Sequence, residues 1–228
     1  MKEILLWDLP TRLFHWLLVL CVFSAIASGI VGGQWMALHV QAGLAVIFLI
    51  AFRLVWGVFG STYARFCQFF PTPGRVLAYL KGQWQGEGHN PLGAFSVFAL
   101  LFLCIFQAVS GLFTTDEITL KGPLYNLIDK DTSLFITSIH KQMAWVLMAF
   151  IGLHFLAIVF YKIVKKDNLV IPMITGKKQS AHGQSYKPAA LWALILALLV
   201  AAIALYLAYG AWIPTPPPAA PPPPAPAW

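Results

Sequence analysis

The sequence has few charged residues: Asp, Glu, Lys and Arg together make up 10% of its 228 residues, whereas 59% are hydrophobic. A soluble domain normally carries about 25% charged residues, so this composition excludes an ordinary soluble protein. The hydrophobic residues form five runs of roughly 20 residues, the length that crosses a bilayer as a helix and is too long for a barrel strand. The predicted spans are Leu13–Gly33, His39–Phe59, Leu92–Phe113, Phe135–Tyr161 and Ala189–Trp212.

Several motifs of soluble enzymes are also missing. The three cysteines, Cys21, Cys67 and Cys104, form no C-x-x-C-H motif, which excludes covalent attachment of a c-type haem. The sequence has no Gly-rich nucleotide loop, no Ser–His–Asp pattern and no internal repeat. No Asp or Glu lies inside a predicted span, although buried carboxylates are typical of proton relays. This absence disfavours a non-redox transporter or scaffold, which we keep as an alternative.

The basic residues are concentrated in alternate loops. They lie before the first span, in the loop between spans two and three, and around the loop between spans four and five: Lys2, Arg12, Arg65, Arg75, Lys81, Lys162, Lys165, Lys166, Lys177, Lys178 and Lys187. The opposite loops are uncharged (residues 29–38) or carry four of the eight acidic side chains against two lysines (residues 114–134). The positive-inside rule then predicts a multi-pass membrane protein with a cytoplasmic N-terminus and an extracytoplasmic C-terminus. The net charge of +7 reflects this topology, and no nucleic-acid partner is expected.

Histidine is the residue that a lipid-facing helix has least reason to contain, because an ionisable side chain in the membrane is costly and marks function. Four of the six histidines lie in the predicted spans: His15, His39, His140 and His154. His140 and His154 are fourteen residues apart on one helix, which places them ~21 Å apart along the axis and on nearly the same face. They are too far apart to share one metal, so each needs a partner on another helix.

Membrane depth selects these partners. The predicted topology places His39 and His140 near the outer surface, and His15 and His154 near the cytoplasmic surface. Two imidazoles on opposite sides of a porphyrin fill both axial positions of an electron-transfer haem. Zinc usually takes four ligands, and no carboxylate or cysteine lies at these depths to complete such a site. We therefore predict an outer haem between His39 and His140 and an inner haem between His15 and His154.

Other residues near the ligands fit a flat macrocycle with carboxylate groups. Gly43, Ala144 and Gly152 are small, although ordinary packing of membrane helices would also explain them. Arg53 and Arg12 lie at cytoplasmic depth and are candidate contacts for the propionates of the inner haem, because a guanidinium binds planar carboxylates through two hydrogen bonds. Snorkelling toward lipid headgroups is the alternative for both arginines.

The two remaining histidines lie in cytoplasmic segments. His182 is expected to be solvated. His89 precedes the third span, and both helix entry and a role in a site remain open for it.

Four motifs resemble the bacterial transmembrane di-haem cytochromes b, the cytochrome b561-like group that includes the b-type subunit of nickel–iron hydrogenases. They are WDLPTRLFHW (7–16), FRLVWGVFGSTYARF (52–66), GHNPLGAF (88–95) and KKDNLVIPMITGKK (165–178). The resemblance implies an all-α, four-helix membrane bundle with two haems b, held by His15, His39, His140 and His154. Residues 1–178 form this predicted domain, residues 179–213 add a fifth membrane helix with its leading loop, and residues 214–228 form a proline-rich extracytoplasmic tail.

The resemblance predicts a protein of the bacterial inner membrane. It would transfer electrons across that membrane in a respiratory chain, between an extracytoplasmic redox protein and the quinone pool. The expected partners are the lipid membrane, a quinone and either a hydrogenase-type enzyme or a cytochrome c. A superoxide- or cytochrome c-linked quinone oxidoreductase of the same family is the alternative. Whether the chain is itself an enzyme or only an electron-carrying subunit stays open.

Overall fold

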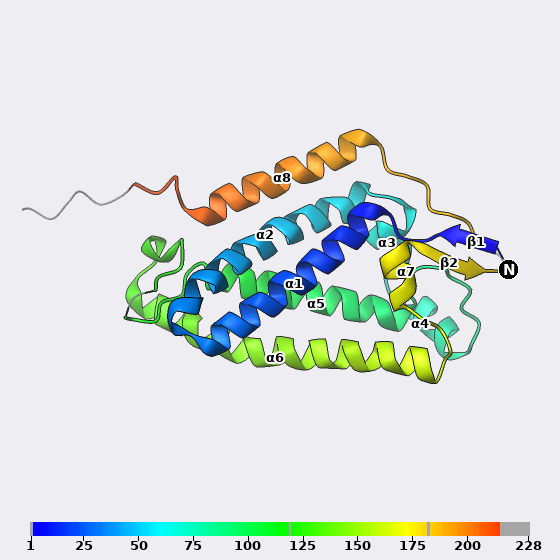
Figure 1. Ribbon diagram of the computed structural model, residues 1–228, viewed down its shortest axis with the longest axis horizontal. Helices are drawn as coiled ribbons and strands as arrows, with labels where there is room; N and C mark the ends of the chain where they lie inside the picture. Colours follow the sequence, from blue (N-terminus) through cyan, green and yellow to red (C-terminus); the bar gives the residue numbers. More distant parts are fainter. Residues whose placement is uncertain (1, 119, 182, 215–228) are drawn as a thin grey trace, which may run out of the picture.

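The computed structural model describes residues 2–118, 120–181 and 183–214 of the chain. Within these residues the fold is almost entirely helical, with one small sheet (Figure 1). The long helices are α1 (Leu9–Val31), α2 (Met36–Phe59), α5 (Pro91–Gly111), α6 (Lys130–Ile163) and α8 (Leu191–Tyr209). The shorter elements are β1 (Lys2–Leu5), η1 (Gly33–Trp35), η2 (Thr62–Ala64), α3 (Phe66–Phe69), α4 (Pro73–Leu80), η3 (Tyr125–Leu127), α7 (Val170–Thr175) and β2 (Lys177–Ser180).

All five predicted spans are helices long and apolar enough to cross a membrane. Their starts follow from capping residues in the sequence. Asp8 accepts a hydrogen bond from the backbone of Thr11 at the start of α1, and Asn90 accepts one from Gly93 at the start of α5. Asp129 caps α6 in the same way, so this helix begins five residues before the predicted apolar run. The described chain is therefore a multi-pass helical membrane protein.

The long helices lie side by side (Figure 1). The main packing contacts are α1 with α2, α2 with α5, α5 with α6, and α2 with α8. Helix α8 thus lies along the outside of α2, and the predicted haem ligands are on α1, α2 and α6. Of the predicted tail, residues 215–228 lie outside the described residues.

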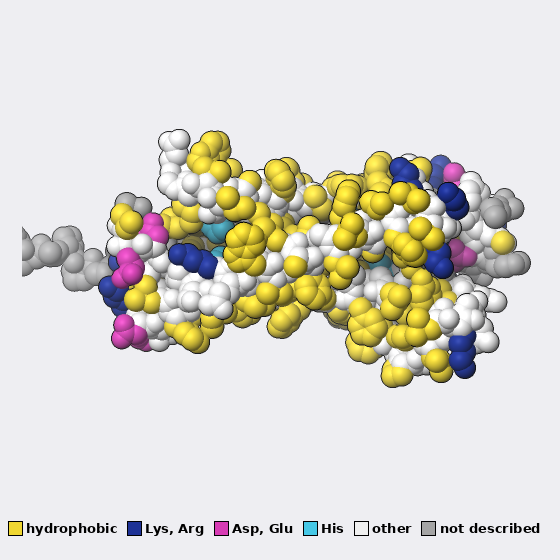
Figure 2. Space-filling view, turned by 90° about the horizontal axis from the view of Figure 1, so that it is seen from below, with side chains coloured by type: hydrophobic (Ala, Val, Ile, Leu, Met, Phe, Trp, Pro, Cys, Tyr) yellow, Lys and Arg dark blue, Asp and Glu magenta, His cyan; other side chains and the backbone are white. Residues whose placement is uncertain are grey.

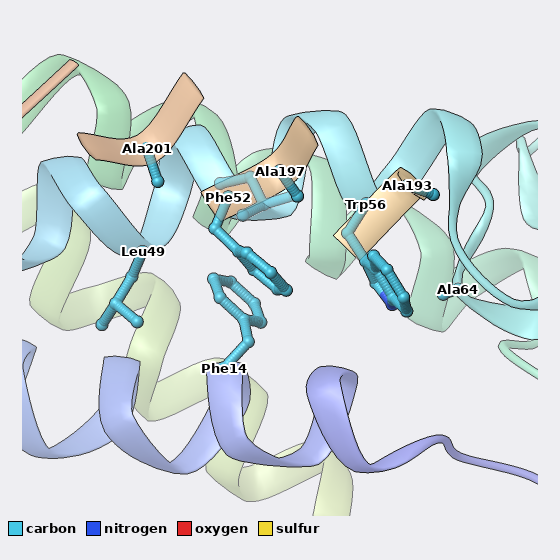
Figure 3. Close-up of a cluster of buried hydrophobic side chains, with 9 residues drawn as sticks. Phe14, Leu49, Phe52, Trp56, Ala64, Ala193, Ala197 and Ala201 are labelled. Atoms are coloured by element: carbon cyan, nitrogen blue, oxygen red, sulfur yellow. The ribbon is translucent and has the colours of Figure 1, made fainter. Parts of the chain in front are cut away.

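Small side chains let α8 approach α2 closely. Ala193, Ala197 and Ala201, one turn apart, are fully buried against the core residues Phe52 and Trp56 (Figure 3). Small residues at helix contacts are typical of membrane proteins, because close backbone approach replaces the hydrophobic effect as the source of stability. Most of the other α8 side chains are exposed, so this helix forms one edge of the molecule.

We expect deletion of residues 189–228 to leave haem binding intact and to lower the melting temperature by a few degrees. Helix α8 carries no predicted ligand, and the face of α2 that it covers is apolar and compatible with lipid. The ratio of haem to protein and a thermal melt in detergent measure the two effects, with deletion of residues 215–228 as the control. Loss of haem from the longer deletion alone would show that α8 supports the ligand helices.

One end of the bundle is closed by segments that are distant in sequence. Strand β1 pairs antiparallel with β2, with Lys2 opposite Ser180 and Leu5 opposite Lys177. Helix α7 is tied to α1 by a hydrogen bond from Trp16 Nε1 to the Met173 carbonyl. These contacts bring the end of the predicted domain back to its beginning.

The surface agrees with a membrane location. In Figure 2 hydrophobic side chains cover the middle of the molecule, and charged side chains gather at its two ends. Acidic side chains mark the end that carries the loop between α5 and α6, and basic side chains are prominent at the other end. The structure thus separates the two loop sets that differ in charge in the sequence.

Candidate cofactor sites

His39 on α2 and His140 on α6 face each other at one end of the bundle. Their ring centroids are 6.1 Å apart and their ring planes are nearly perpendicular, at 82°. The Nδ1 atom of His39 lies 2.8 Å from the Ala25 carbonyl oxygen, and Nδ1 of His140 lies 2.9 Å from Ser110 Oγ. Because Nδ1 of each ring is hydrogen-bonded to its surroundings, Nε2 is the nitrogen left to bind a ligand.

A cavity of about 440 Å³ lies beside these two rings. Its lining is mainly apolar and includes Gly43 and Ala144, two of the small residues predicted near the ligands. Gly29 and Gly111 also line it, and each touches a histidine. A Cβ atom on Gly29 would lie 2.9 Å from Nδ1 of His39, and one on Gly111 would lie 3.2 Å from Cε1 of His140. Glycine at these positions therefore gives the imidazoles room.

The spacing of His39 and His140 would allow both rings to bind one haem iron. A metal–nitrogen bond of ~2 Å and roughly 1 Å from that nitrogen to the ring centre, on both sides, place the centroids about 6 Å apart. The observed 6.1 Å agrees with this value. Among residues 2–118, 120–181 and 183–214, no three His, Cys, Asp or Glu side chains are grouped to hold a metal ion. The donor set thus suits a haem, whose porphyrin supplies the other ligands, better than zinc.

His15 on α1 and His154 on α6 lie toward the opposite end, within electrostatic range of each other. His154 Nδ1 is 3.2 Å from Ser96 Oγ. His15 Nδ1 is buried and has no hydrogen-bond partner among the described residues. One imidazole of the second predicted pair is therefore hydrogen-bonded through Nδ1 and the other is not, and their pairing on one haem stays a prediction. Gly152, the small residue predicted beside His154, has open space where a Cβ would be.

Arg53 on α2 is buried, with its guanidinium 5.9 Å from the ring centroid of Phe14, the neighbour of His15 in the chain. Its side chain is only 3% exposed, and its guanidinium lies over the Phe66 ring at 4.5 Å. Its Nη1 atom has no hydrogen-bond partner, and no ion pair involves Arg53 within the described part of the chain. Asp8 interacts with it electrostatically, but the Asp8 carboxylate already accepts hydrogen bonds from the Thr11 backbone and Trp56 Nε1. An unpaired buried cation is costly, so the site is suited to an added anionic group such as a haem propionate.

The sequence left the role of His89 open, and the structure shows that its ring is buried. Its ring packs between Trp7 and Phe69, at centroid distances of 4.7 and 4.5 Å. Its Nδ1 is buried without a partner among the described residues. Burial lowers the pKa of His89 to about 3, with a smaller effect from Arg53, so the ring is neutral at physiological pH. His89 is thus a buried ring within electrostatic range of Arg53. His182 lies outside the described residues.

Arg12 has a different environment. Its Nη1 donates a hydrogen bond to the Ile174 carbonyl in α7, so this side chain helps to hold α7 against α1. Its Nε atom is buried without a partner in the described chain. Contact between Arg12 and a propionate stays a prediction. The hydrogen bond to Ile174 gives Arg12 a structural role in addition.

Sequence reasoning missed the two serines and two of the glycines that contact the histidines. A lone serine or glycine in a membrane helix is common and signals nothing by itself. The spacing carried a usable signal, however, because Ser96 and Ser110 are fourteen residues apart on α5, as His140 and His154 are on α6.

Comparison with known proteins gives a consistent result. The family described as prokaryotic cytochrome b561 matches residues 6–176. The probable Ni/Fe-hydrogenase 1 B-type cytochrome subunit of Escherichia coli K12 is 21% identical over 221 residues, covering 78% of this chain and 92% of that protein. The probable Ni/Fe-hydrogenase B-type cytochrome subunit of Rhizobium leguminosarum bv. viciae is 22% identical over 218 residues, covering 78% and 89%. No solved structure matches.

Proposed function

The chain belongs to the prokaryotic cytochrome b561 family, and from this premise we propose that it carries electrons across the membrane through two haems b. His39 and His140 would hold the outer haem, and His15 and His154 the inner one. The electrons would pass between an extracytoplasmic redox protein and the membrane quinone pool. The observation that carries this proposal is the pair of imidazoles 6.1 Å apart beside a cavity of about 440 Å³.

A bound haem supplies a centre that accepts and releases one electron. The chain's own residues provide its ligands and environment. The mainly apolar lining of the outer cavity would limit the contact of a bound haem with water, and burial is one of the means by which a protein sets a haem potential. Lys141, beside His140 on the same lining, is a candidate partner for an outer propionate. At the inner site Arg53 would supply the positive charge.

The proposed orientation places the His39–His140 end outside the cell and the N-terminus in the cytoplasm. It rests on the charge of the loops, because Lys and Arg are enriched in cytoplasmic loops of bacterial inner-membrane proteins. The end with β1, β2 and α7 carries the lysine-rich segments, and the loop between α5 and α6 with the first turn of α6 carries four of the eight acidic residues. The outer haem would then lie next to an extracytoplasmic partner.

A hydrogenase-type enzyme is the proposed partner, supported by the names of the relatives. A basic cytochrome c would instead need an acidic docking surface. Three of the acidic side chains in the outer loop have internal partners. Glu117 forms an ion pair with Lys130, Asp129 caps α6, and Asp116 accepts from the Ile118 and Leu120 backbone. These acidic side chains therefore stabilise the loop itself and are less available to dock a basic protein. Cytochrome c is for this reason the weaker candidate.

We expect the purified protein to contain two haems b per chain, both low-spin with two imidazole ligands. A pyridine haemochrome assay against protein concentration gives the number, and electron paramagnetic resonance (EPR) of the oxidised protein gives the spin state and ligand type. Purified apoprotein reconstituted with haem controls for incomplete loading during expression. A saturating ratio of one haem per chain would contradict the proposal of two sites.

A further inference from the structure

The two serines of α5 repeat the spacing of the two histidines of α6. Ser96 and Ser110 are fourteen residues apart, as are His140 and His154, and fourteen residues correspond to ~21 Å and nearly four turns of helix. Because α5 and α6 are packed, consecutive long helices, their chains run in opposite directions. Ser110 therefore meets His140 at one end of the contact, and Ser96 meets His154 at the other. The Oγ–Nδ1 distances are 2.9 and 3.2 Å.

The hydrogen bonds of Ser110 determine which nitrogen of His140 carries the proton. Ser110 Oγ also lies 3.2 Å from the Gln107 carbonyl oxygen, which can only accept. The Ser110 hydroxyl therefore donates to Gln107 and accepts the Nδ1–H of His140. This leaves a lone pair on Nε2, the state that binds a metal. Coordination of His154 through Nε2 likewise requires Nδ1 to donate to Ser96 Oγ.

We propose that Ser96 and Ser110 are positioning residues, one for each haem, which fix the orientation of the α6 imidazoles and set the reduction potentials. This inference rests on the proposed function, since it assigns a role to residues that touch the proposed ligands. A hydrogen bond from Nδ1–H makes the imidazole a more basic ligand. A more basic ligand stabilises ferric over ferrous iron, so each serine lowers the potential of the haem on its own side.

The two sites differ in how many such bonds they have. In the outer pair both imidazoles are held, His39 by the Ala25 carbonyl and His140 by Ser110. In the inner pair Ser96 holds His154, while His15 Nδ1 has no partner in the described chain. Loss of Ser96 would therefore leave neither inner imidazole held through Nδ1, whereas loss of Ser110 would leave one outer imidazole held.

The test is a potentiometric titration of the full-length, haem-loaded protein and its variants, followed by optical and EPR spectroscopy. We expect Ser110→Ala to shift the reduction equilibrium of the outer haem toward the ferrous state by about threefold to tenfold, where tenfold corresponds to about 59 mV for one electron. The inner haem should keep its potential. Ser96→Ala should change the inner haem alone. Variants that lack one haem identify which potential belongs to which site.

Threonine and valine replacements distinguish the effect of the hydroxyl group from the effect of side-chain volume. The two side chains have nearly the same shape, so Ser110→Thr should keep the wild-type potential and EPR spectrum, and Ser110→Val should behave like Ser110→Ala. If Ser110→Ala fails to retain the outer haem, retention by the threonine variant but not the valine variant still supports the role of the hydroxyl. Ser133→Ala is the matched control, since Ser133 is fully buried but its hydroxyl donates to the Phe113 carbonyl.

Equal potentials and equal haem retention in the threonine and valine variants would overturn the inference and leave the serines as packing residues. This outcome is distinct from failure of the proposed function, which would appear as wild-type protein that binds fewer than two haems.

Discussion

Alanine at His140 is expected to remove the outer haem and to leave the inner haem in place, whereas His154→Ala does the reverse. Each histidine supplies one of two axial ligands, and ~21 Å of helix separates them, so neither can replace the other. Haem content should fall from two to one per chain in both variants. Electron transfer from one side of a liposome to the other should be abolished in both, because each haem serves one half of the membrane.

The four single variants together test the pairing. His39→Ala and His140→Ala should lose the same component of the redox titration, because these two imidazoles lie 6.1 Å apart. His15→Ala and His154→Ala should lose the other component. Gln142→Ala is the control on α6, since the Gln142 side chain is exposed and donates to Ser138 Oγ. If His39→Ala removed the same component as His154→Ala, the depth argument would be wrong.

The sequence was sufficient for the membrane helices, whereas the pairing of the histidines on two haems stays a prediction. The five apolar runs and their capping residues reflect local physics, because a helix in lipid must satisfy its own backbone hydrogen bonds. The grouping of His39 with His140 needs only the loop charges and the rise per residue. Neither argument requires knowledge of how the helices pack against one another.

Features that depend on contacts between distant segments were not predictable in this way. Strands β1 and β2 are four residues each and separated by most of the chain, so neither has a periodic pattern of its own. The contact of Gly29 with the His39 ring depends on how closely α1 and α2 approach each other. The burial of His89 depends on Trp7 and Phe69, which reach it from two other segments. Residue type alone indicated none of these contacts.

Arg53→Met is expected to weaken retention of the inner haem by about 3 kcal/mol or more, the cost of removing one partner from a buried ion pair. The proposed partner of the guanidinium is a propionate. The protein provides a buried position over the Phe66 ring and leaves Nη1 without a partner of its own. Transfer of haem to an excess of a haem-scavenging apoprotein measures the loss, and the outer haem should be retained as in the wild type.

The haem-free protein should respond to the same substitution in the opposite direction. Without a propionate the Arg53 guanidinium is a buried cation with no ion pair in the described chain, and replacing such a charge with an apolar side chain is often neutral or stabilising. Thermal melts of apoprotein made under haem limitation should therefore show that Arg53→Met has an equal or higher melting temperature. If Arg53 had only a structural role, Arg53→Met would lower the melting temperature of both the haem-loaded and the haem-free protein.

Two further variants make the result specific. Arg53→Lys should retain the inner haem to an intermediate extent, because an ammonium keeps the charge but lacks the planar pair of donors that matches a carboxylate. Arg75→Met is the control, since the Arg75 side chain donates to the Cys67 and Phe70 carbonyls in the segment between α2 and α5. If Arg53→Met released the inner haem no faster than Arg75→Met did, Arg53 would not contact a propionate, and the anionic group that balances its charge would have to be sought elsewhere.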